Sequence, residues 1–541
     1  MTTQIKTNQS LDIRDVLKSF PFPEFRRFQK ETIEEIAQAF NSGYRWILLE
    51  TPTGFGKSPV NVAFCRALHS FYITPQNILI DQLNRDFPDL ALIKGREHYN
   101  CAEILRGNCA ENAPCKQNSE YICHNKYVRC PYWIAKIRAI EAQTALTNFA
   151  YFVGEGLLHD TNVPHFGDRE LLVIDEGHNI DQHILDHISI TVESRTLPYS
   201  VFQSIKKKLA TMPERLTSEQ IDELLNDTAL HCKRFLDSLP DILSREQVRE
   251  KEKALKFRQK VENYWKNHDA EWVGQTNEKI YKKGIWIEAK IQPIYARGFT
   301  YNHLWKRANR FIISSATIFM HDFVKECGLA EHADEVCYTH TLSTFPIRNR
   351  MIINAAVGSL SWNKKEENLP TALGAISKIL DVEKGKGIIH AHSYGFAEAI
   401  KNGVPNPRLM FHISKDRDDV LNDFLEALPE SGKVLVSVAM TEGLDLKGDL
   451  ATFQIMFKCP FPNYREDLRV YRRLKELKHN KWYGIQTLKT IIQAYGRAVR
   501  SPTDVAKFYV IDDDVNRVCK RWYSQLPQFF REAYNARERF L

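Results

Sequence analysis

The sequence lacks any apolar run of roughly 18 residues, the length that a membrane-spanning helix needs. Its first residues also lack the apolar stretch of a secretory signal; they read MTTQIKTNQSLDIRD. It has no short-period repeat and no low-complexity tract. These absences predict a cytoplasmic protein, or a nucleoid or nuclear one, with reduced thiols and no association with membranes.

The composition is that of an ordinary globular protein. The chain has 541 residues, of which 43% are hydrophobic and 26% charged. This length suggests about three to four domains. The formal net charge of +7 permits a polyanionic partner such as nucleic acid, and it equally fits a slightly basic enzyme.

Five of the 11 cysteines lie close together, with the spacing C-x7-C-x5-C-x7-C-x6-C, and a proline follows the last. In a reducing compartment such a group indicates a metal site rather than disulfides. Four thiolates could hold an iron–sulfur cluster or a structural zinc ion, for which His124 offers a further ligand. The five are Cys101, Cys109, Cys115, Cys123 and Cys130.

Upstream of the cysteines, the segment TPTGFGKS is typical of a phosphate-binding loop. Gly54 and Gly56 permit a tight turn that points backbone N–H groups at phosphate. Lys57 supplies a positive charge, and the Ser58 hydroxyl can ligate magnesium. The segment lacks the glycine that usually begins this pattern, but an apolar strand-like segment precedes the loop and a helical one follows it. The sequence therefore predicts a nucleotide site.

Downstream of the cysteines, the segment LLVIDEGHN is an apolar strand that ends in two carboxylates. Ligands bind at the carboxyl ends of strands in open α/β sheets. Asp175 is predicted to hold magnesium, and Glu176 to orient and polarise the attacking water.

The second half of the chain contains the segment QAYGRAVRS, in which Arg497 and Arg500 are spaced by one helical turn. This spacing predicts that both guanidinium groups lie on one helix face. From there they could stabilise charge on a γ-phosphate across a cleft, as an arginine finger does. The loop at 440–445 follows another predicted strand and could also reach a ligand.

These motifs, in this order, resemble those of the XPD/DinG type of superfamily 2 helicases, the iron–sulfur helicases. RRFQKETI resembles the adenine-side motif, TPTGFGKS motif I, TPQNILIDQL motif Ia, and DEGHN a DEAH box with Gly177 in place of alanine. SSATI, IIHAHSY, VAMTEGLDLKG and QAYGRAVRS resemble motifs III to VI. The resemblance covers nearly the whole chain.

The resemblance implies an α/β fold with two RecA-like P-loop motor domains, and with a cysteine-rich iron–sulfur insertion and a helical arch inserted in the first. Strands that alternate with helices in both halves agree with it. The expected division is motor domain 1 at 1–94, 136–190 and 286–345, the iron–sulfur domain at 95–135, the arch at 191–285, and motor domain 2 at 346–541.

The resemblance also implies a set of site residues, with ATP, Mg²⁺ and a 4Fe–4S cluster as cofactors. The nucleotide-binding set is Gln29, Thr53, Gly54, Phe55, Gly56, Lys57, Ser58 and Asp445, with Ser58 and Asp175 at magnesium. The catalytic set is Lys57, Asp175, Glu176, His178, Gln493, Arg497 and Arg500. Coupling of hydrolysis to movement is expected of Ser314, Ala316 and Thr317.

The family uses four cysteine ligands, whereas this chain offers five. The resemblance favours Cys101, Cys115, Cys123 and Cys130 as the ligands, and leaves Cys109 as the spare cysteine.

The implied function is ATP-driven translocation on single-stranded DNA, 5′ to 3′, with unwinding of forked DNA near the cluster by a monomer. Two alternatives are a zinc- or cluster-containing ATPase that remodels protein–DNA or RNA–DNA complexes, and a catalytically silent DNA-binding scaffold. Aromatic residues beside basic ones, Tyr464 with Arg465 and those at 471–473, are candidates for tracking the strand or for packing the motor domain.

Overall fold

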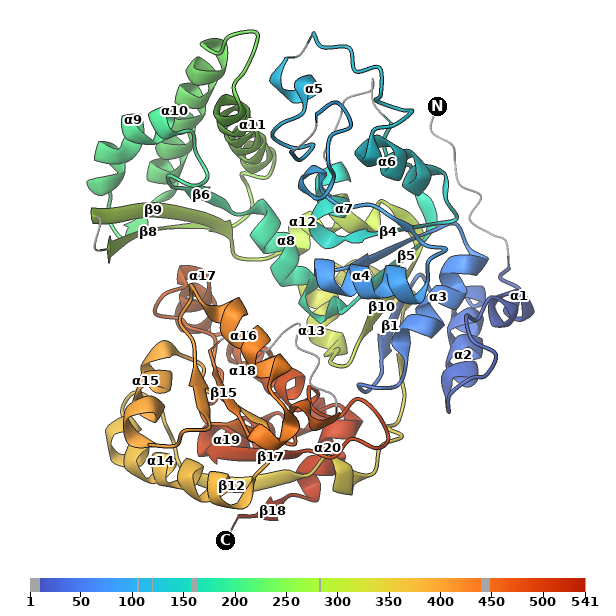
Figure 1. The fold of residues 1–541 in the computed structure, drawn as a ribbon, viewed down its shortest axis with the longest axis vertical. Helices are drawn as coiled ribbons and strands as arrows, with labels where there is room; N and C mark the ends of the chain where they lie inside the picture. The colour runs from blue at the N-terminus through green and yellow to red at the C-terminus, as the bar shows by residue number, and fades with distance from the viewer. Residues whose placement is uncertain are drawn as a thin grey trace.

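The computed structural model describes residues 10–104, 107–118, 120–156, 164–281, 284–438 and 448–540. Two α/β domains make up most of the fold, and two insertions extend from the first (Figure 1); we call the two domains motor domain 1 and motor domain 2 after the expected division. In this view motor domain 2, in orange and red, lies below motor domain 1, and the arch insertion, in green, lies at the upper left. The predicted α/β fold with two parallel sheets is confirmed.

Motor domain 1 is built on a seven-stranded parallel sheet with the order β11-β1-β10-β5-β2-β4-β3. Successive residues of β1 enter opposite cores, Trp46 and Leu48 on one face and Ile47 and Leu49 on the other. A sheet covered on both faces explains why its strands are nearly continuous apolar runs. The strands are β1 (Trp46–Glu50), β2 (Ser70–Thr74), β3 (Ala91–Leu92), β4 (Thr144–Asn148), β5 (Arg169–Asp175), β10 (Ala308–Ser315) and β11 (Val336–His340).

The helices of motor domain 1 cover the two faces of this sheet. They are α1 (Ile13–Lys18), α2 (Gln29–Asn41), α3 (Lys57–Ala67), α4 (Asn77–Asp86), α6 (Pro131–Glu141), α7 (Phe149–Gly156), α8 (Ile180–Ile188), α12 (Arg297–Thr300) and α13 (Met320–Glu326).

Motor domain 2 repeats this plan with a parallel sheet in the order β14-β15-β13-β16-β17-β12-β18. The strands are β12 (Ile352–Gly358), β13 (Gly387–His390), β14 (Leu409–Phe411), β15 (Val434–Ser437), β16 (Phe453–Met456), β17 (Lys507–Asp512) and β18 (Glu538–Arg539). The helices are α14 (Lys365–Val382), α15 (Tyr394–Gly403), α16 (Arg417–Glu426), α17 (Leu468–Tyr471), α18 (Asn480–Tyr495), α19 (Asp513–Arg521) and α20 (Gln528–Asn535).

The cysteine-rich insertion lies between β3 and α6 and has little regular structure apart from α5 (Pro114–Gln117). Its last cysteine, Cys130, caps α6, and the following proline takes the first helical position, where a missing N–H costs nothing. Glu111 of this insertion accepts hydrogen bonds from Arg245 and Arg249 of the arch. The two insertions therefore touch each other as well as motor domain 1.

The arch insertion contains three helices, α9 (Tyr199–Ala210), α10 (Ser218–Asp237) and α11 (Arg245–Lys266). It also contains an antiparallel sheet that the sequence analysis did not predict, formed by β6 (Ile190–Val192), β7 (Arg215–Leu216), β8 (Trp272–Tyr281) and β9 (Gly284–Pro293). The alternating residues Ile287, Ala289 and Ile291 pack beneath the helices and were the available signal. Because β9 continues to Pro293, the insertion extends beyond the expected end at 285.

Candidate active site

Two glycines shape the phosphate-binding loop between β1 and α3. Gly54 and Gly56 have φ values of +80° and +85°, which side chains disfavour. A Cβ atom on Gly54 would lie 2.5 Å from the carbonyl oxygen of Arg500 and 2.3 Å from the Phe345 ring. The loop therefore needs glycine both for its turn and for the close approach of the second half of the chain.

Gln29 lies behind this loop, and its side chain is 1% exposed. Its amide nitrogen donates to the carbonyl oxygens of Phe55 and Gly56, each at 3.1 Å. Its amide oxygen accepts from the backbone N–H of Arg26 at 2.8 Å. These bonds fix the shape of the loop from behind. The Arg26 side chain, which the sequence analysis missed, reaches the Gly54 carbonyl oxygen at 3.4 Å.

A cavity of about 410 Å³ lies between the motor domains, and we call it the nucleotide cavity. It brings together most of the residues that the sequence analysis selected. Thr53 lies beside it and donates to the carbonyl oxygen of Val499 at 3.2 Å. Asp445 and the rest of 439–447 lie outside the described residues. The predicted residues in the lining are Gly54, Gly56, Lys57, Ser58, Asp175, Glu176, His178, Arg497 and Arg500.

The two arginines reach the cavity from a segment whose backbone conformation differs from the expected helix. Helix α18 ends at Tyr495, and Gly496 caps it, so Arg497 and Arg500 follow the helix instead of sharing one of its faces. The helical prediction for this pair is wrong: the N–H of Gly496 makes the last i to i−4 bond of the helix, to Ile492, and the N–H of Arg497 bonds to Ala494 instead. Both residues nevertheless line the nucleotide cavity.

Asp175 ends β5 and is held by three donors. Its carboxylate accepts from the Ser314 hydroxyl at 3.1 Å, the Tyr72 hydroxyl at 3.2 Å and the backbone N–H of Glu176 at 3.0 Å. Burial and the adjacent Glu176 raise the pKa of Asp175. Carboxylate and hydroxyl oxygens suit magnesium, so Asp175 and Ser58 fit the site that the sequence predicts.

Glu176 follows with a left-handed backbone, φ +51°, which turns its side chain into the cavity. Burial alone would raise its pKa, but a hydrogen bond from His178 and the charges of Lys57 and Arg497 outweigh burial and hold the pKa below its usual range. The His178 Nδ1 atom lies 3.3 Å from Glu176 and 2.8 Å from the Ser315 hydroxyl. Glu176 is thus an ionised carboxylate, suited to orient a water molecule.

The glycine in the DEGHN segment has a local steric cause. A Cβ atom on Gly177 would lie 2.3 Å from the Cγ2 atom of Ile313 on the neighbouring strand β10. Alanine at this position would require β10 or the loop to move.

Two hydrogen bonds join α18 of motor domain 2 to these loops. Gln493 donates to the Thr317 hydroxyl at 2.6 Å. Lys489, which is 7% exposed, donates to the backbone carbonyl oxygen of His178 at 3.1 Å. The sequence analysis missed Lys489, although its spacing of four residues from Gln493 indicates the same helix face.

All five clustered cysteines line one small cavity together with Arg96 and Glu103. The guanidinium of Arg96 donates to the Cys109 sulfur at 3.5 Å, and the Cys123 thiol donates to Glu103 at 3.4 Å. Burial raises the pKa of Cys109 to about 11 despite the nearby Arg96 charge. Among the described residues, no three His, Cys, Asp or Glu side chains are arranged to hold one metal ion.

A second cavity of about 410 Å³ lies between α8 of motor domain 1 and the carboxyl edge of the motor domain 2 sheet. Four of its side chains carry a buried donor atom without a hydrogen-bond partner in the described part of the chain. These donor atoms belong to a hydroxyl, a guanidinium, an indole and an amide group. The cavity therefore favours a ligand rich in hydrogen-bond acceptors. The four side chains are those of Ser437, Arg469, Trp482 and Gln486.

Of the two aromatic–basic candidates, the segment at 471–473 is a packing surface. The Arg215 guanidinium lies 4.1 Å from the Tyr471 ring centroid, and Arg473 is buried in a bidentate ion pair with Glu326. Arg465 remains exposed.

Comparison with known proteins agrees with this geometry. A family model described as "Helicase C-terminal domain" matches residues 376–533, and one described as "Type III restriction enzyme, res subunit" matches residues 22–212. Among curated proteins, "ATP-dependent DNA helicase CHL1" of Saccharomyces cerevisiae is 29% identical over 150 residues, which are 24% of this chain and 17% of that protein. "Fanconi anemia group J protein homolog" of Gallus gallus is 26% identical over 180 residues, 30% of this chain and 14% of that protein. The matched region thus spans less than a fifth of either relative.

Solved structures show the same fold. The match to a structure titled "XPD_Helicase" covers 96% of this chain and 100% of the chain in that structure, with 13% identity and a TM-score of 0.63. A structure titled "Structure of S. tokodaii Xpd4" covers 95% and 100%, with 14% identity and a TM-score of 0.58.

The two parallel sheets and the cavity between them define a two-motor P-loop nucleotide-binding protein. Both family matches, the curated relatives and the solved structures make the chain similar to superfamily 2 helicases of the XPD/DinG type. In the described part of the chain, no helix has the length and apolar character to cross a membrane.

Proposed function

We propose that this protein is an ATP-dependent DNA helicase that moves along single-stranded DNA. The observation that carries the proposal is the nucleotide cavity, where Lys57, Asp175 and Glu176 from motor domain 1 share a lining with Arg497 and Arg500 from motor domain 2. A triphosphate bound there would be contacted by both motor domains, so its hydrolysis could change how they sit together.

In this proposal each residue has a separate chemical role. Lys57 and the loop N–H groups bind the phosphates, and Asp175 with Ser58 would hold Mg²⁺, which neutralises phosphate charge when bound. Glu176 orients the attacking water, and its low pKa keeps it ionised. Arg497 and Arg500 stabilise charge on the γ-phosphate. Thr317 and Gln493 carry the resulting change between the motor domains.

The second cavity is the proposed seat of the DNA backbone on motor domain 2. A phosphodiester supplies acceptor oxygens and negative charge, which suit the four donors that lack partners in the described structure. Contact with the backbone alone also explains how a motor can advance along any base sequence.

The proposed cofactor of the cysteine-rich insertion is a 4Fe–4S cluster. Four thiolates around one cavity fit such a group, which would brace an insertion with little regular structure of its own.

We further infer that the ligands are Cys101, Cys109, Cys115 and Cys130, so that Cys123 takes the place of Cys109 as the spare cysteine. The positive charge of Arg96 acts on both Cys109 and Cys115 and favours their thiolates. Burial raises the pKa of both Cys109 and Cys123 to about 11, but the neighbouring charges differ: Cys123 faces the Glu103 carboxylate, which disfavours its thiolate. This inference revises the choice that the family resemblance favoured.

Strand displacement tests the proposed function and its polarity. The expected result is ATP-dependent unwinding of a duplex with a 5′ overhang and little unwinding of one with a 3′ overhang. The Lys57→Ala variant should unwind neither. Wild-type protein that binds but does not unwind either substrate, while still hydrolysing ATP, would favour the alternative of a remodelling ATPase.

The absorbance of anaerobically purified protein tests the cluster and its ligands. A brown protein with a broad band near 400 nm, on the order of that given by iron–sulfur charge transfer, is expected. The Cys109→Ser variant should lose the band and Cys123→Ser should keep it. A colourless protein that contains zinc would refute the cluster, and loss of the band in Cys123→Ser alone would refute the ligand assignment.

A further inference from the structure

Trp362 is an exposed tryptophan on the loop that follows β12, and its side chain is 72% exposed. The guanidinium of Arg465 lies 4.5 Å from its ring centroid. Tryptophan is highly buried on average, so an indole that leaves most of its surface in solvent needs an explanation. Because Arg465 covers one part of the ring and the remainder is open, the indole offers a flat apolar surface beside a positive charge.

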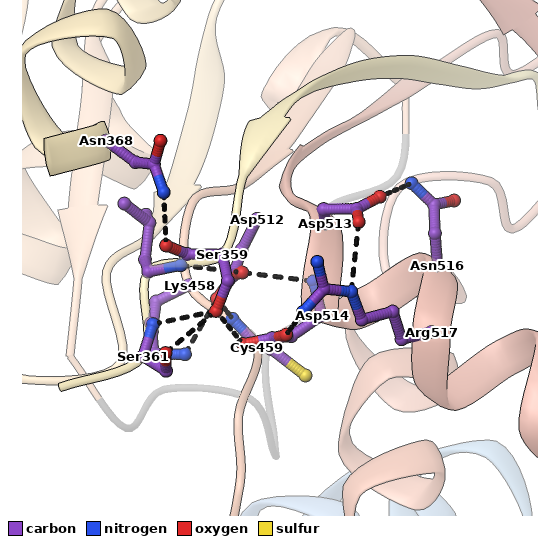
Figure 2. Close-up of polar contacts among 11 residues, drawn as sticks. Ser359, Ser361, Asn368, Lys458, Cys459, Asp512, Asp513, Asp514, Asn516 and Arg517 are labelled. Carbon is purple, nitrogen blue, oxygen red and sulfur yellow. Dashed lines mark hydrogen bonds and ion pairs between the residues drawn. The ribbon is translucent and has the colours of Figure 1, made fainter. Parts of the chain in front are cut away.

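The loop that carries Trp362 is held in place by a buried carboxylate. Asp512, at the end of β17, is 0% exposed and accepts from the backbone N–H of Leu360 at 3.1 Å. Its neighbour Asp514 accepts from the Ser359 hydroxyl at 2.7 Å. Figure 2 shows these bonds converging on the loop from β17 and α19. The loop is therefore fixed by interactions that do not involve Trp362 itself.

The same carboxylate also holds the segment that leads to Arg465. Asp512 accepts from the Lys458 ammonium at 2.7 Å and from the backbone N–H of Cys459 at 2.9 Å (Figure 2). Further along, the backbone N–H of Arg465 donates to the side chain of Asn463 at 3.1 Å. Asp512 thus anchors both segments from which Trp362 and Arg465 extend, so the backbone on either side of the pair is organised before any ligand binds.

The pair also lies next to the second cavity. In the strand order β15-β13-β16-β17-β12, the carboxyl ends carry, in sequence, Ser437, His390, Lys458, Asp512 and the loop at 359–362. Ser437, His390 and Lys458 line the second cavity. Asn463, which precedes Arg465 by two residues, lines it as well. The loop that carries the indole therefore lies farther along the same sheet edge than Ser437, His390 and Lys458.

We propose that Trp362, supported by Arg465, is a stacking platform for one base of a single strand whose backbone occupies the second cavity. This inference rests on the proposed function and deepens it by naming a base contact. Aromatic rings accept any base because every base has a flat π face, so the platform adds affinity without sequence preference. A backbone contact and a stacked base together also define where the strand leaves the cavity.

Equilibrium binding of a single-stranded oligonucleotide of mixed sequence tests the platform. Trp362→Ala should bind roughly 5- to 150-fold more weakly than the wild type, which is the usual range for loss of one aromatic stacking contact, and Trp362→Phe should retain most of the affinity. The slope of affinity against salt concentration should not change, because no phosphate contact is lost.

An abasic oligonucleotide of equal length is the matched control, since it keeps the backbone and lacks the base. Trp362→Ala and the wild type should bind it equally. The inference is overturned if Trp362→Ala binds the mixed-sequence oligonucleotide as tightly as the wild type does, which is expected of a tryptophan that binds a protein partner. It is also overturned if the substitution weakens binding of both oligonucleotides equally. Failure of the wild type to bind any single strand would instead overturn the proposed function itself.

Discussion

Gln493 of motor domain 2 donates a 2.6 Å hydrogen bond to the hydroxyl of Thr317 in motor domain 1. Thr317 follows β10, and the Ser314 hydroxyl at the end of that strand donates to Asp175. One short path therefore links the magnesium ligand predicted in motor domain 1 to helix α18 of motor domain 2. Movement of one motor domain against the other must stretch or break this link.

Loss of the Gln493–Thr317 bond should impair coupling more than nucleotide binding. Gln493→Ala should lower DNA-stimulated kcat for ATP by about 2- to 10-fold, the usual worth of one hydrogen bond, and leave the KM for ATP nearly unchanged. Thr317→Val should behave alike, and the double variant should be no worse than either. Additive losses in steady-state kinetics would show that the two residues act independently.

Glu50 should make the stability of motor domain 1 depend on pH. It ends β1, accepts from the Ile318 N–H at 2.8 Å and from the Tyr338 hydroxyl at 2.9 Å, and burial raises its pKa to about 7. A carboxyl group with a raised pKa stabilises the fold below its ordinary unfolded value of 4.5, and this contribution falls as pH rises through 7.

Glu50→Gln should remove this dependence. The expected gain in the free energy of unfolding over the wild type is on the order of 1–3 kcal/mol at pH 8, with little difference at pH 5. Thermal unfolding of both proteins across this range provides the measurement. Equal pH profiles for the two proteins would mean that Glu50 does not titrate as proposed.

The buried pair Arg473–Glu326 should hold the motor domains together. Its nitrogen–oxygen distances are 2.8 and 2.7 Å, and the side chains are 2% and 4% exposed. Glu326→Gln should destabilise the protein by about 3–5 kcal/mol, because it leaves Arg473 buried without its counter-charge. The paired variant Arg473→Met with Glu326→Leu should recover most of that loss in thermal unfolding. A double variant as unstable as Glu326→Gln would contradict this explanation.

Contact between the cysteine-rich insertion and the arch should weaken with salt. Glu111 accepts from Arg245 and Arg249, each at 2.7 Å, and the arginine hydrogen bonds lower its pKa to about 2. The two arginine side chains are about half exposed and Glu111 is 23% exposed, so ions can reach and screen the pairs. Fluorescence transfer between dyes on the insertion and on α11 should report a longer distance in Glu111→Gln at low salt, and in the wild type at high salt. Asp89→Asn, which removes an ion pair to Arg66 within motor domain 1, is the control and should leave that distance unchanged.

Much of the fold could be predicted because its signals are local. The apolar strands β1, β5 and β10 each run directly into a polar loop, so the strand, the turn and the catalytic residue type lie within one short segment. The same holds for Lys57, Asp175 and Glu176, which the nucleotide cavity brings together.

The residues that sequence reasoning missed act across long separations. The spacing of Lys489 from Gln493 indicates a shared helix face, but nothing in either segment indicates that Lys489 reaches the His178 carbonyl oxygen. The arch sheet was missed because β8 and β9 pair chiefly with each other and bury only one face, which weakens their apolar pattern. The helical spacing of the two arginines misled because α18 ends at Tyr495, before either of them, and Gly496 follows with a right-handed φ of −72° instead of the left-handed turn that marks many helix ends.

Steady-state ATP hydrolysis with and without single-stranded DNA tests most directly whether the nucleotide cavity drives a motor on DNA. The wild type should hydrolyse ATP faster with DNA present, Lys57→Ala should show no stimulated turnover, and Glu176→Gln should lose about 100-fold or more in kcat. A wild type whose turnover is undetectable or indifferent to DNA, or a Lys57→Ala variant that remains active, would contradict the proposal.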